Sequence, residues 1–123
     1  MVNNGTLTIK PISANLLRDT DTFCKMDPYL VLDVGYDKFK TKIMNNHGTT
    51  VKFDDVFNVK IADITSFRAT IWDEDTGKDD LVARGDIPLS DVFEKGEVNQ
   101  ESQLFYDGQV AGIIVFDLKF ESD

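Results

Sequence analysis

Hydrophobic and polar residues alternate along most of this chain, which is the period of a β-strand that buries one face. Turn-forming residues separate the alternating stretches, at 35–37, 45–48, 76–78 and 107–108. The predicted strands cover residues 6–10, 29–34, 38–43, 57–61, 67–72, 83–89, 102–106 and 112–120. This pattern favours an all-β fold, an eight-stranded antiparallel β-sandwich. One short helix is predicted over residues 89–96, with Ser90 as its N-cap.

The length of the chain suits one domain. Its 123 residues predict a single domain over 1–123, with an ordered core over about 5–120 and short polar ends. No apolar run reaches the length that crosses a bilayer, and the first residues lack the basic-then-apolar pattern of a secretion signal. Cys24 has no second cysteine to pair with, so a reducing, cytoplasmic setting is expected.

The balance of charge restricts the partners. The chain has 22 acidic and 13 basic residues, a formal net charge of −9 and a pI near 4.4. Such a chain repels nucleic acid and the anionic face of a membrane. Nucleic acid is therefore not an expected partner, and binding to an anionic membrane requires a cation that reverses the local charge.

The acidic residues gather in the predicted loops. Five of them lie between Asp73 and Asp80, and Asp21 and Asp27 follow the first strand six residues apart. Two carboxylates about 4 Å apart repel by about 4 kcal/mol at an effective dielectric constant of about 20. Counting strands up and down an antiparallel sandwich brings the loops at 21–27, 45–50 and 73–80 to the same edge. The crowded carboxylates therefore predict a bound cation at that edge.

Calcium fits these ligands best. It accepts many oxygen ligands in flexible geometry, whereas magnesium keeps more water, and zinc or copper would need more than the single histidine and single cysteine present. An EF-hand loop that started at Asp73 would place Gly77 at its fifth position and Arg84 at its twelfth, so that motif fails. Asp73 and Asp75 lie two residues apart at a strand end and can reach one ion, with the Glu74 carbonyl pointing inward.

Three stretches of the sequence resemble the C2 domain family, a calcium- and phospholipid-binding sandwich. They read DTFCKMDPYLVLDVG, KFKTKI and WDEDTGKDDLVARGDIPL, and their order and spacing together carry the resemblance. It covers about residues 5–120 and implies the Greek-key C2 fold. It also implies the type II topology, because the first strand leads directly into the first acidic loop and the last strand is left to lie beside it.

The resemblance implies a set of calcium ligands. The expected carboxylates are Asp21, Asp27, Asp73 and Asp75, with Asp80 or Asp79 as the fifth. Asp80 is favoured over Asp79 because it directly precedes the next strand. The backbone carbonyls of Thr20 and Glu74 are expected to add oxygen ligands. Two calcium ions are expected rather than three, because the third loop is shorter than in many members of the family.

The resemblance also implies contacts with lipid. The residues expected to make them are Phe23, Met26, Tyr29, Lys38, Lys40, Lys42 and Trp72. Phe23 at the tip of the first loop is expected to insert shallowly, with folding back onto the sandwich as the alternative. The three lysines with Tyr29 and Trp72 match a phosphoinositide groove found in a subset of the family. They also fit a plain exposed sheet face, and Trp72 fits a core position equally well.

The sequence therefore predicts a non-catalytic module that docks on anionic phospholipid membranes when calcium binds. The expected lipid is phosphatidylserine or a phosphoinositide, and the chain would move from the cytoplasm to the membrane as calcium rises. The alternative is a protein-interaction or scaffold domain that calcium only stabilises. An enzyme is not expected, because the chain has no GxSxG motif, no Cys–His pair and no glycine-rich phosphate loop.

Overall fold

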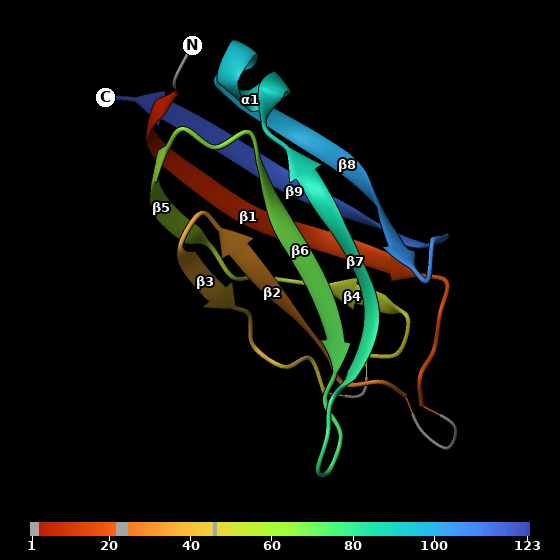
Figure 1. The fold of residues 1–123 in the computed structure, drawn as a ribbon. Coiled ribbons are helices and arrows are strands. Elements are labelled where there is room, and N and C mark those ends of the chain that lie inside the picture. The colour runs from red at the N-terminus through yellow and green to blue at the C-terminus, as the bar shows by residue number, and fades with distance from the viewer. Residues whose placement is uncertain (1–2, 22–24, 46) are drawn as a thin grey trace.

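Figure 1 shows the computed structural model, which describes residues 3–21, 25–45 and 47–123. The described residues form nine strands and one short helix, and every strand pair is antiparallel. The strands are β1 (Asn4–Leu16), β2 (Pro28–Val34), β3 (Asp37–Lys40), β4 (Thr50–Lys52), β5 (Phe57–Ala62), β6 (Ser66–Asp73), β7 (Asp80–Pro88), β8 (Glu97–Tyr106) and β9 (Gln109–Ser122). The helix is α1 (Ser90–Lys95), between β7 and β8.

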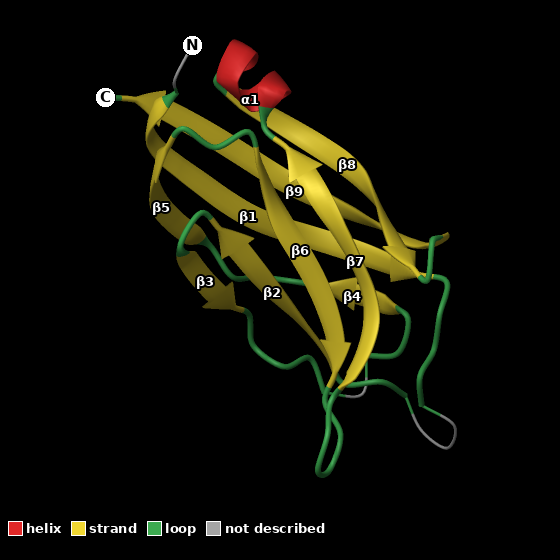
Figure 2. Cartoon of the chain, in the orientation of Figure 1, coloured by secondary structure: helices red, strands yellow, loops and turns green. Residues whose placement is uncertain are grey.

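The strands form one sheet that folds over into two layers (Figure 2). Its order is β3-β2-β6-β7-β8-β9-β1-β4, and β5 pairs with β1 on the same side as β4. One layer holds β3, β2, β6 and β7, and the other holds β8, β9, β1, β4 and β5. A single register pair, Arg84 with Phe105, joins β7 to β8 between the layers. The predicted all-β antiparallel sandwich is confirmed.

The order of the first and last strands also agrees with the sequence. β1 runs directly into the first acidic loop, as the type II arrangement requires. β9 pairs with β1 along nearly its whole length and with β8 on its other edge. The last strand therefore lies beside the first, where the sequence left room for it.

The structure corrects three details of the prediction. There is a ninth strand, β4, which pairs with β1 but has only three residues, too few to show an alternating pattern. The lysine strand ends at Lys40, because the buried Thr41 hydroxyl accepts the Leu30 N–H (2.9 Å) and donates to the Lys42 carbonyl (3.1 Å). Ser90 begins α1 instead of capping it, since the N-cap position is Leu89 and no side chain caps the helix.

The core lies between the two layers, where the inward faces of the strands meet. The Phe67 ring on β6 packs edge-on against the Phe116 ring on β9, with centroids 5.3 Å apart. The largest fully buried side chains are Phe67, Phe116, Leu7, Ile9, Met26, Leu30, Leu32, Ile71, Ile87, Leu89, Leu104 and Ile114. Most of them are the apolar members of the predicted alternation, which explains why that pattern specified the layers. The described part of the chain contains no helix with the length and apolar character of a membrane span.

Gly112 on β9 sets how closely β9 approaches β1. A Cβ atom there would lie 2.7 Å from the Asn15 carbonyl oxygen and 3.2 Å from the Leu16 Cα atom. Gly112→Ala is therefore expected to lower the free energy of unfolding by about 1–3 kcal/mol, because backbone atoms must move apart. Urea unfolding measures this change. Gln103→Ala, at an exposed position on β8, is the control and should change it by about 0.5 kcal/mol or less. Equal midpoints for Gly112→Ala and the unsubstituted chain would contradict the close approach.

Candidate functional site

Three loops meet at one end of the sandwich, at the bottom of Figure 1. We define them as the first loop (residues 17–27), the second loop (41–49) and the third loop (74–79). The Glu74 N–H donates to the Asp27 carbonyl (3.0 Å) and joins the third loop to the first. The His47 and Gly48 N–H groups donate to the Met26 carbonyl (3.0 and 3.1 Å) and join the second loop to the first. The convergence expected from strand counting is confirmed.

Asp73 lies at the centre of this end. It is the last residue of β6, and only 3% of its surface is exposed. Its Oδ2 atom accepts a hydrogen bond from the Thr20 hydroxyl (2.8 Å), and its Oδ1 atom accepts one from the Asp27 N–H (2.9 Å). A buried carboxylate requires such donors, because an unpaired charge is costly to remove from water. Asp73 therefore ties the end of β6 to both ends of the described part of the first loop.

Asp79 is held by Tyr29 and by its own loop. The Tyr29 hydroxyl donates to Asp79 Oδ2, and the Asp75 N–H donates to Asp79 Oδ1 (3.2 Å). Burial and the bond to Asp79 raise the pKa of Tyr29 to about 12. The hydrogen bonds from Tyr29 and from the Asp75 N–H lower the pKa of Asp79. The Lys40 ammonium lies 4.3 Å from the centre of the Tyr29 ring, so these side chains form one charged group beside the third loop.

The remaining predicted carboxylates lie around these two. Asp75 is exposed, and its Oδ1 atom accepts the Thr76 N–H (2.7 Å). Asp80 begins β7 and lies opposite Asp73 in the strand register. Asp21 is half-buried and its N–H donates to Asp19 Oδ1 (2.9 Å). The structure thus brings Asp27, Asp73, Asp75, Asp79 and Asp80 to one end of the molecule, with Asp21 on the first loop.

The chemistry of these donors fits calcium, which prefers carboxylate and carbonyl oxygen atoms. Among the residues that the structure describes, however, no group of three or more His, Cys, Asp or Glu side chains is arranged to hold a metal ion. The reason is visible in the hydrogen bonds: the carboxylates of Asp73, Asp75 and Asp79 accept from hydroxyl and N–H donors of the loops. The donor set is present, and its side chains bond to the protein.

The lysine strand differs from its prediction. The Lys42 ammonium pairs with Asp54 (3.1 Å), away from the β3 face, because the strand has already ended. Lys38 pairs with Asp33 on β2 (3.6 Å). Only Lys40 contacts an aromatic ring of the expected groove, that of Tyr29. The half-buried Trp72 lies opposite Tyr29 in the register of β6 and β2.

Two predicted lipid contacts lie on the first loop. Phe23 falls outside the described residues. Met26 was expected near the exposed tip, and the structure corrects this placement: its side chain is fully buried in the core. Its sulfur accepts weak hydrogen bonds from the Thr20 N–H and hydroxyl (3.4 and 3.5 Å). Met26 therefore supports the first loop from below. At the start of the same loop, Leu17 is 74% exposed, which the sequence analysis did not single out.

Arg18 is another residue that the sequence analysis missed. Its guanidinium lies 3.6 Å from the centre of the Tyr106 ring on β8, and Nη2 donates to the Leu81 carbonyl on β7 (3.5 Å). It thereby connects the start of the first loop to two strands. No local pattern signals this role, because both contacts come from residues more than 60 positions away.

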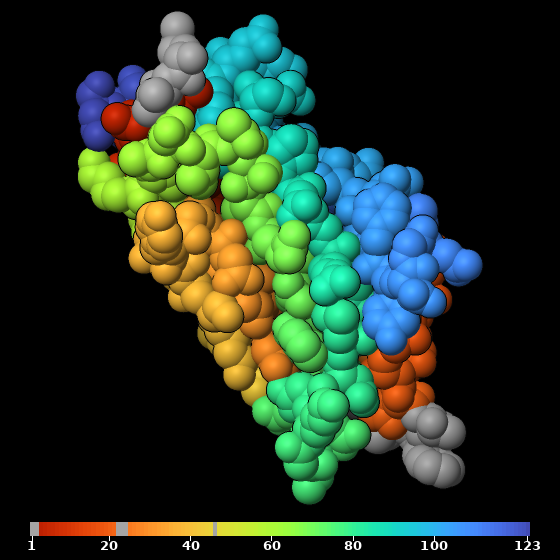
Figure 3. All heavy atoms as spheres, in the orientation of Figure 1, coloured from red at the N-terminus to blue at the C-terminus, as the bar shows by residue number. Residues whose placement is uncertain are grey.

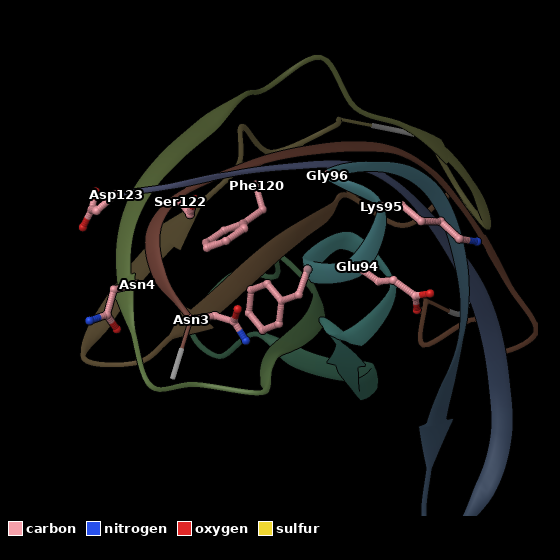
Figure 4. Close-up of a pocket in the computed structure, with 9 residues that line it drawn as sticks. Asn3, Asn4, Glu94, Lys95, Gly96, Phe120, Ser122 and Asp123 are labelled. Atoms are coloured by element: carbon pink, nitrogen blue, oxygen red, sulfur yellow. The ribbon is translucent and has the colours of Figure 1, made fainter. Parts of the chain in front are cut away.

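A hollow of about 720 Å³ lies at the opposite end of the molecule, beside α1 and both chain ends (Figures 1 and 4). Its apolar wall is formed by Phe93 and Phe120, whose rings pack edge-on at 4.8 Å. Polar groups of both chain ends, including Asn3 and Asp123, form the rest of the lining. The hollow is separate from the acidic loops.

Known proteins share both this sequence and this fold. The chain is 34% identical to 16 kDa phloem protein 2 of Arabidopsis thaliana over 97 residues, which are 77% of this chain and 66% of that protein. It is 28% identical to Elicitor-responsive protein 3 of Oryza sativa subsp. japonica over 96 residues, which are 76% of this chain and 67% of that protein. The chain thus spans about two thirds of the length of these curated relatives.

Solved structures agree with these relatives. A C2 domain-containing protein from a putative elicitor-responsive gene is 31% identical and superposes with a TM-score of 0.85, covering 98% of this chain and 91% of its own. The two calcium-bound C2 domains of Extended-Synaptotagmin 2 share the fold, with a TM-score of 0.84 at 23% identity over 98% of this chain and 46% of theirs. The sequence model of the C2 domain family matches residues 5–104. Since that match takes in most of the chain and includes all three loops, this protein belongs to the C2 domain family.

Proposed function

We propose that this chain is a calcium-dependent module that binds anionic phospholipid membranes through its three loops. The observation that carries the proposal is the position of Asp73, whose two carboxylate oxygens accept from Thr20 and Asp27 of the first loop. This bonding holds the acidic first and third loops together at one end of the sandwich. Membership of the C2 family supports a membrane-binding module in general.

The proposed ligands come from these two loops. They are the carboxylates of Asp21, Asp27, Asp73, Asp75 and Asp80, with the backbone carbonyls of Thr20 and Glu74. Asp80 is preferred to Asp79 as the fifth carboxylate for two reasons. Asp80 lies directly opposite Asp73 in the register of β6 and β7. The Asp79 carboxylate is already bonded to the Tyr29 hydroxyl and the Asp75 N–H.

Charge explains why the cation is needed. The chain carries a net charge of −9, so its acidic end repels an anionic bilayer. When bound, two calcium ions would bring five carboxylates from about −5 to about −1 and leave coordination positions for a lipid phosphate or carboxylate. Lys40, Tyr29 and Trp72 lie next to these loops and supply a cation and two aromatic rings to the same surface.

The other lysines keep a place in this proposal. Lys38 and Lys42 belong to ion pairs with Asp33 and Asp54, and the four side chains are at least 41% exposed. Exposed ion pairs of this kind contribute about 0–1 kcal/mol, so a lipid phosphate can replace the carboxylate. Phe23 is proposed to enter the headgroup region from the first loop. The proposed module is non-catalytic and binds the membrane surface peripherally.

Vesicle sedimentation tests the proposal directly. The chain is expected to sediment with phosphatidylcholine vesicles that contain phosphatidylserine in millimolar calcium, and to stay in the supernatant when EDTA is added. Vesicles of phosphatidylcholine alone are the control for lipid charge. A chain that stays in solution with phosphatidylserine vesicles at millimolar calcium would remove the membrane function.

A second candidate function is protein interaction with calcium as a stabiliser only. It is favoured by one surface, the solvent face of the β8–β9 hairpin, where Phe105, Val110 and Ile113 are 40%, 45% and 37% exposed. Exposed apolar groups of this density often mark an interface. A complex that survives EDTA and is lost in Val110→Ser would favour this candidate over the membrane function.

A further inference from the structure

The outer face of the layer β3-β2-β6-β7 carries its charges in two distinct rows. Figure 3 shows this face, with β3 and β2 in orange, β6 in green and β7 in blue-green. Each row crosses the strands through residues that are opposite one another in the register. One row contains carboxylates and the other does not, and this difference decides which cations are available to a partner.

The first row neutralises itself. It runs from Lys38 through Asp33 and Arg68 to Asp86, and each neighbour in this row is a register pair. Lys38 pairs with Asp33 at 3.6 Å, and Arg68 pairs with Asp86 at 3.2 Å. Two cations and two carboxylates leave this row without net charge.

The second row has two cations and no carboxylate. It runs from Lys40 through Val31 and Thr70 to Arg84 and ends at Phe105 on β8. Within residues 3–21, 25–45 and 47–123, no ion pair joins Lys40 or Arg84 to an acidic side chain. Three strand spacings, about 14 Å, separate the two cations across the layer. On a protein of net charge −9, this row is a local positive stripe.

The stripe lies next to the end of the sandwich where the three loops meet. The following residues of the same strands are Tyr29, Trp72 and Leu81, which form the last register row before the loops. Lys40 contacts the ring of Tyr29, which in turn bonds to Asp79 of the third loop. The positive stripe is therefore separated from the acidic loops by one row of apolar and aromatic side chains.

Arg84 also lines a depression. With Arg68, Gly85, Asp86 and Phe105 it surrounds a hollow of about 440 Å³ between β7 and β8. An arginine guanidinium offers a planar fork of donors that matches the oxygen atoms of a phosphate. The half-exposed Phe105 ring beside it adds an apolar wall. This combination suits a phosphate group attached to an apolar or glycerol-like body, which is the chemistry of a phospholipid headgroup.

We propose that Arg84, together with Lys40, binds phospholipid headgroup phosphates and extends the membrane contact from the loops across the outer face of this layer. The proposal rests on the proposed membrane function and adds a residue that the lysine strand does not contain. Arg84 takes the place that sequence reasoning gave to Lys38 and Lys42, because those lysines are paired with carboxylates and Arg84 is not. The occupant is a lipid surface, since the stripe is long enough for several headgroups.

The test is a comparison of four variants on phosphatidylserine-containing vesicles in millimolar calcium. Each Lys or Arg near an anionic surface contributes enough to change the partition coefficient about fivefold, so Arg84→Gln is expected to weaken vesicle binding by about that factor. Arg84→Glu reverses the charge and is expected to weaken it about thirtyfold. Arg84→Lys keeps the charge and should retain more binding than Arg84→Gln. Lys10→Gln removes an exposed cation from β1 in the opposite layer and is expected to bind like the unsubstituted chain.

The outcomes separate the two proposals. If the unsubstituted chain sediments and Arg84→Gln binds as tightly as Lys10→Gln, the assignment of Arg84 is wrong and the membrane function stands. If Arg84→Gln and Lys10→Gln weaken binding equally, only net charge matters, and the stripe is again rejected. If the unsubstituted chain does not sediment, the membrane function itself fails. Far-ultraviolet circular dichroism of each variant verifies that the exposed substitutions leave the fold intact.

Discussion

Asp73→Asn is expected to weaken calcium binding by about tenfold or more, because it removes one of the carboxylate charges that the proposed site shares between ions. Asparagine has the same shape as aspartate and keeps one oxygen acceptor, so the bond from the Asp27 N–H can remain. The Thr20 hydroxyl can accept from the new amide as readily as it donates to the carboxylate. The substitution therefore removes charge at the centre of the loops and preserves the local fold.

Isothermal titration with calcium chloride measures this effect. The matched control is Asp117→Asn on β9, an exposed carboxylate that accepts from Asn99 (2.7 Å) and lies outside the three loops. We expect the control to titrate like the unsubstituted chain. The same calcium affinity in Asp73→Asn and Asp117→Asn would exclude Asp73 from the ligands and leave it only its structural bonds to the first loop.

Phe67→Ala is expected to lower the free energy of unfolding by about 3–5 kcal/mol, the range for a large aromatic side chain removed from a core. The Phe67 side chain is 2% exposed, and its ring packs edge-on against Phe116 in the opposite layer. Alanine removes both the buried apolar surface and this contact, and the two layers cannot close the resulting cavity without moving their strands.

Urea unfolding followed by circular dichroism gives the free energy of unfolding of this variant. Tyr36→Ala is the control, because Tyr36 is fully exposed in the turn between β2 and β3 and should change the stability by about 0.5 kcal/mol or less. A loss in Phe67→Ala below about 1 kcal/mol would mean that Phe67 does not lie between the layers. Phe67→Leu should be intermediate, since leucine fills part of the volume.

The alternation of residues was sufficient for the layers because each strand meets the core on one face. On β1, Leu7 and Ile9 are buried, and on β9, Ile114, Phe116 and Leu118 are buried, as the pattern predicts. Burial of the odd or the even set depends only on which members are apolar, so local sequence carries this information. The three-residue strand β4 was missed because its pairing with β1 depends on a distant partner.

The meeting of the acidic loops could also be predicted, since an antiparallel chain returns to the same end after every second strand. The bonds from Thr20 and Asp27 to Asp73 show that the first and third loops do meet. The direction of each carboxylate could not be predicted. Asp79 turns toward Tyr29, a residue 50 positions away, and only the packing of β2 against β6 brings them together.

The charged face shows the same limit more clearly. Three lysines at alternate positions predicted one basic surface, yet Asp33 and Asp54 pair with Lys38 and Lys42, and Lys40 alone is left. Cross-strand neighbours decide which charge is neutralised, and a sequence does not list them. Arg84 stood in the quoted sequence motif only as a residue that breaks the EF-hand pattern. Its position opposite Thr70 and Phe105 is what makes it a candidate for phosphate binding.

By itself the sequence determined the all-β class, the inward face of most strands, and the placing of the aspartates in loops at one end. These properties follow from residue polarity and from the order of strands along the chain. Only the tertiary structure decided that Met26 is buried beneath the first loop, that Asp73 binds the first loop, and that Lys40 and Arg84 share an unpaired row. These properties depend on which residues from distant strands become neighbours, because hydrogen bonds and ion pairs act only over the few ångströms that folding closes.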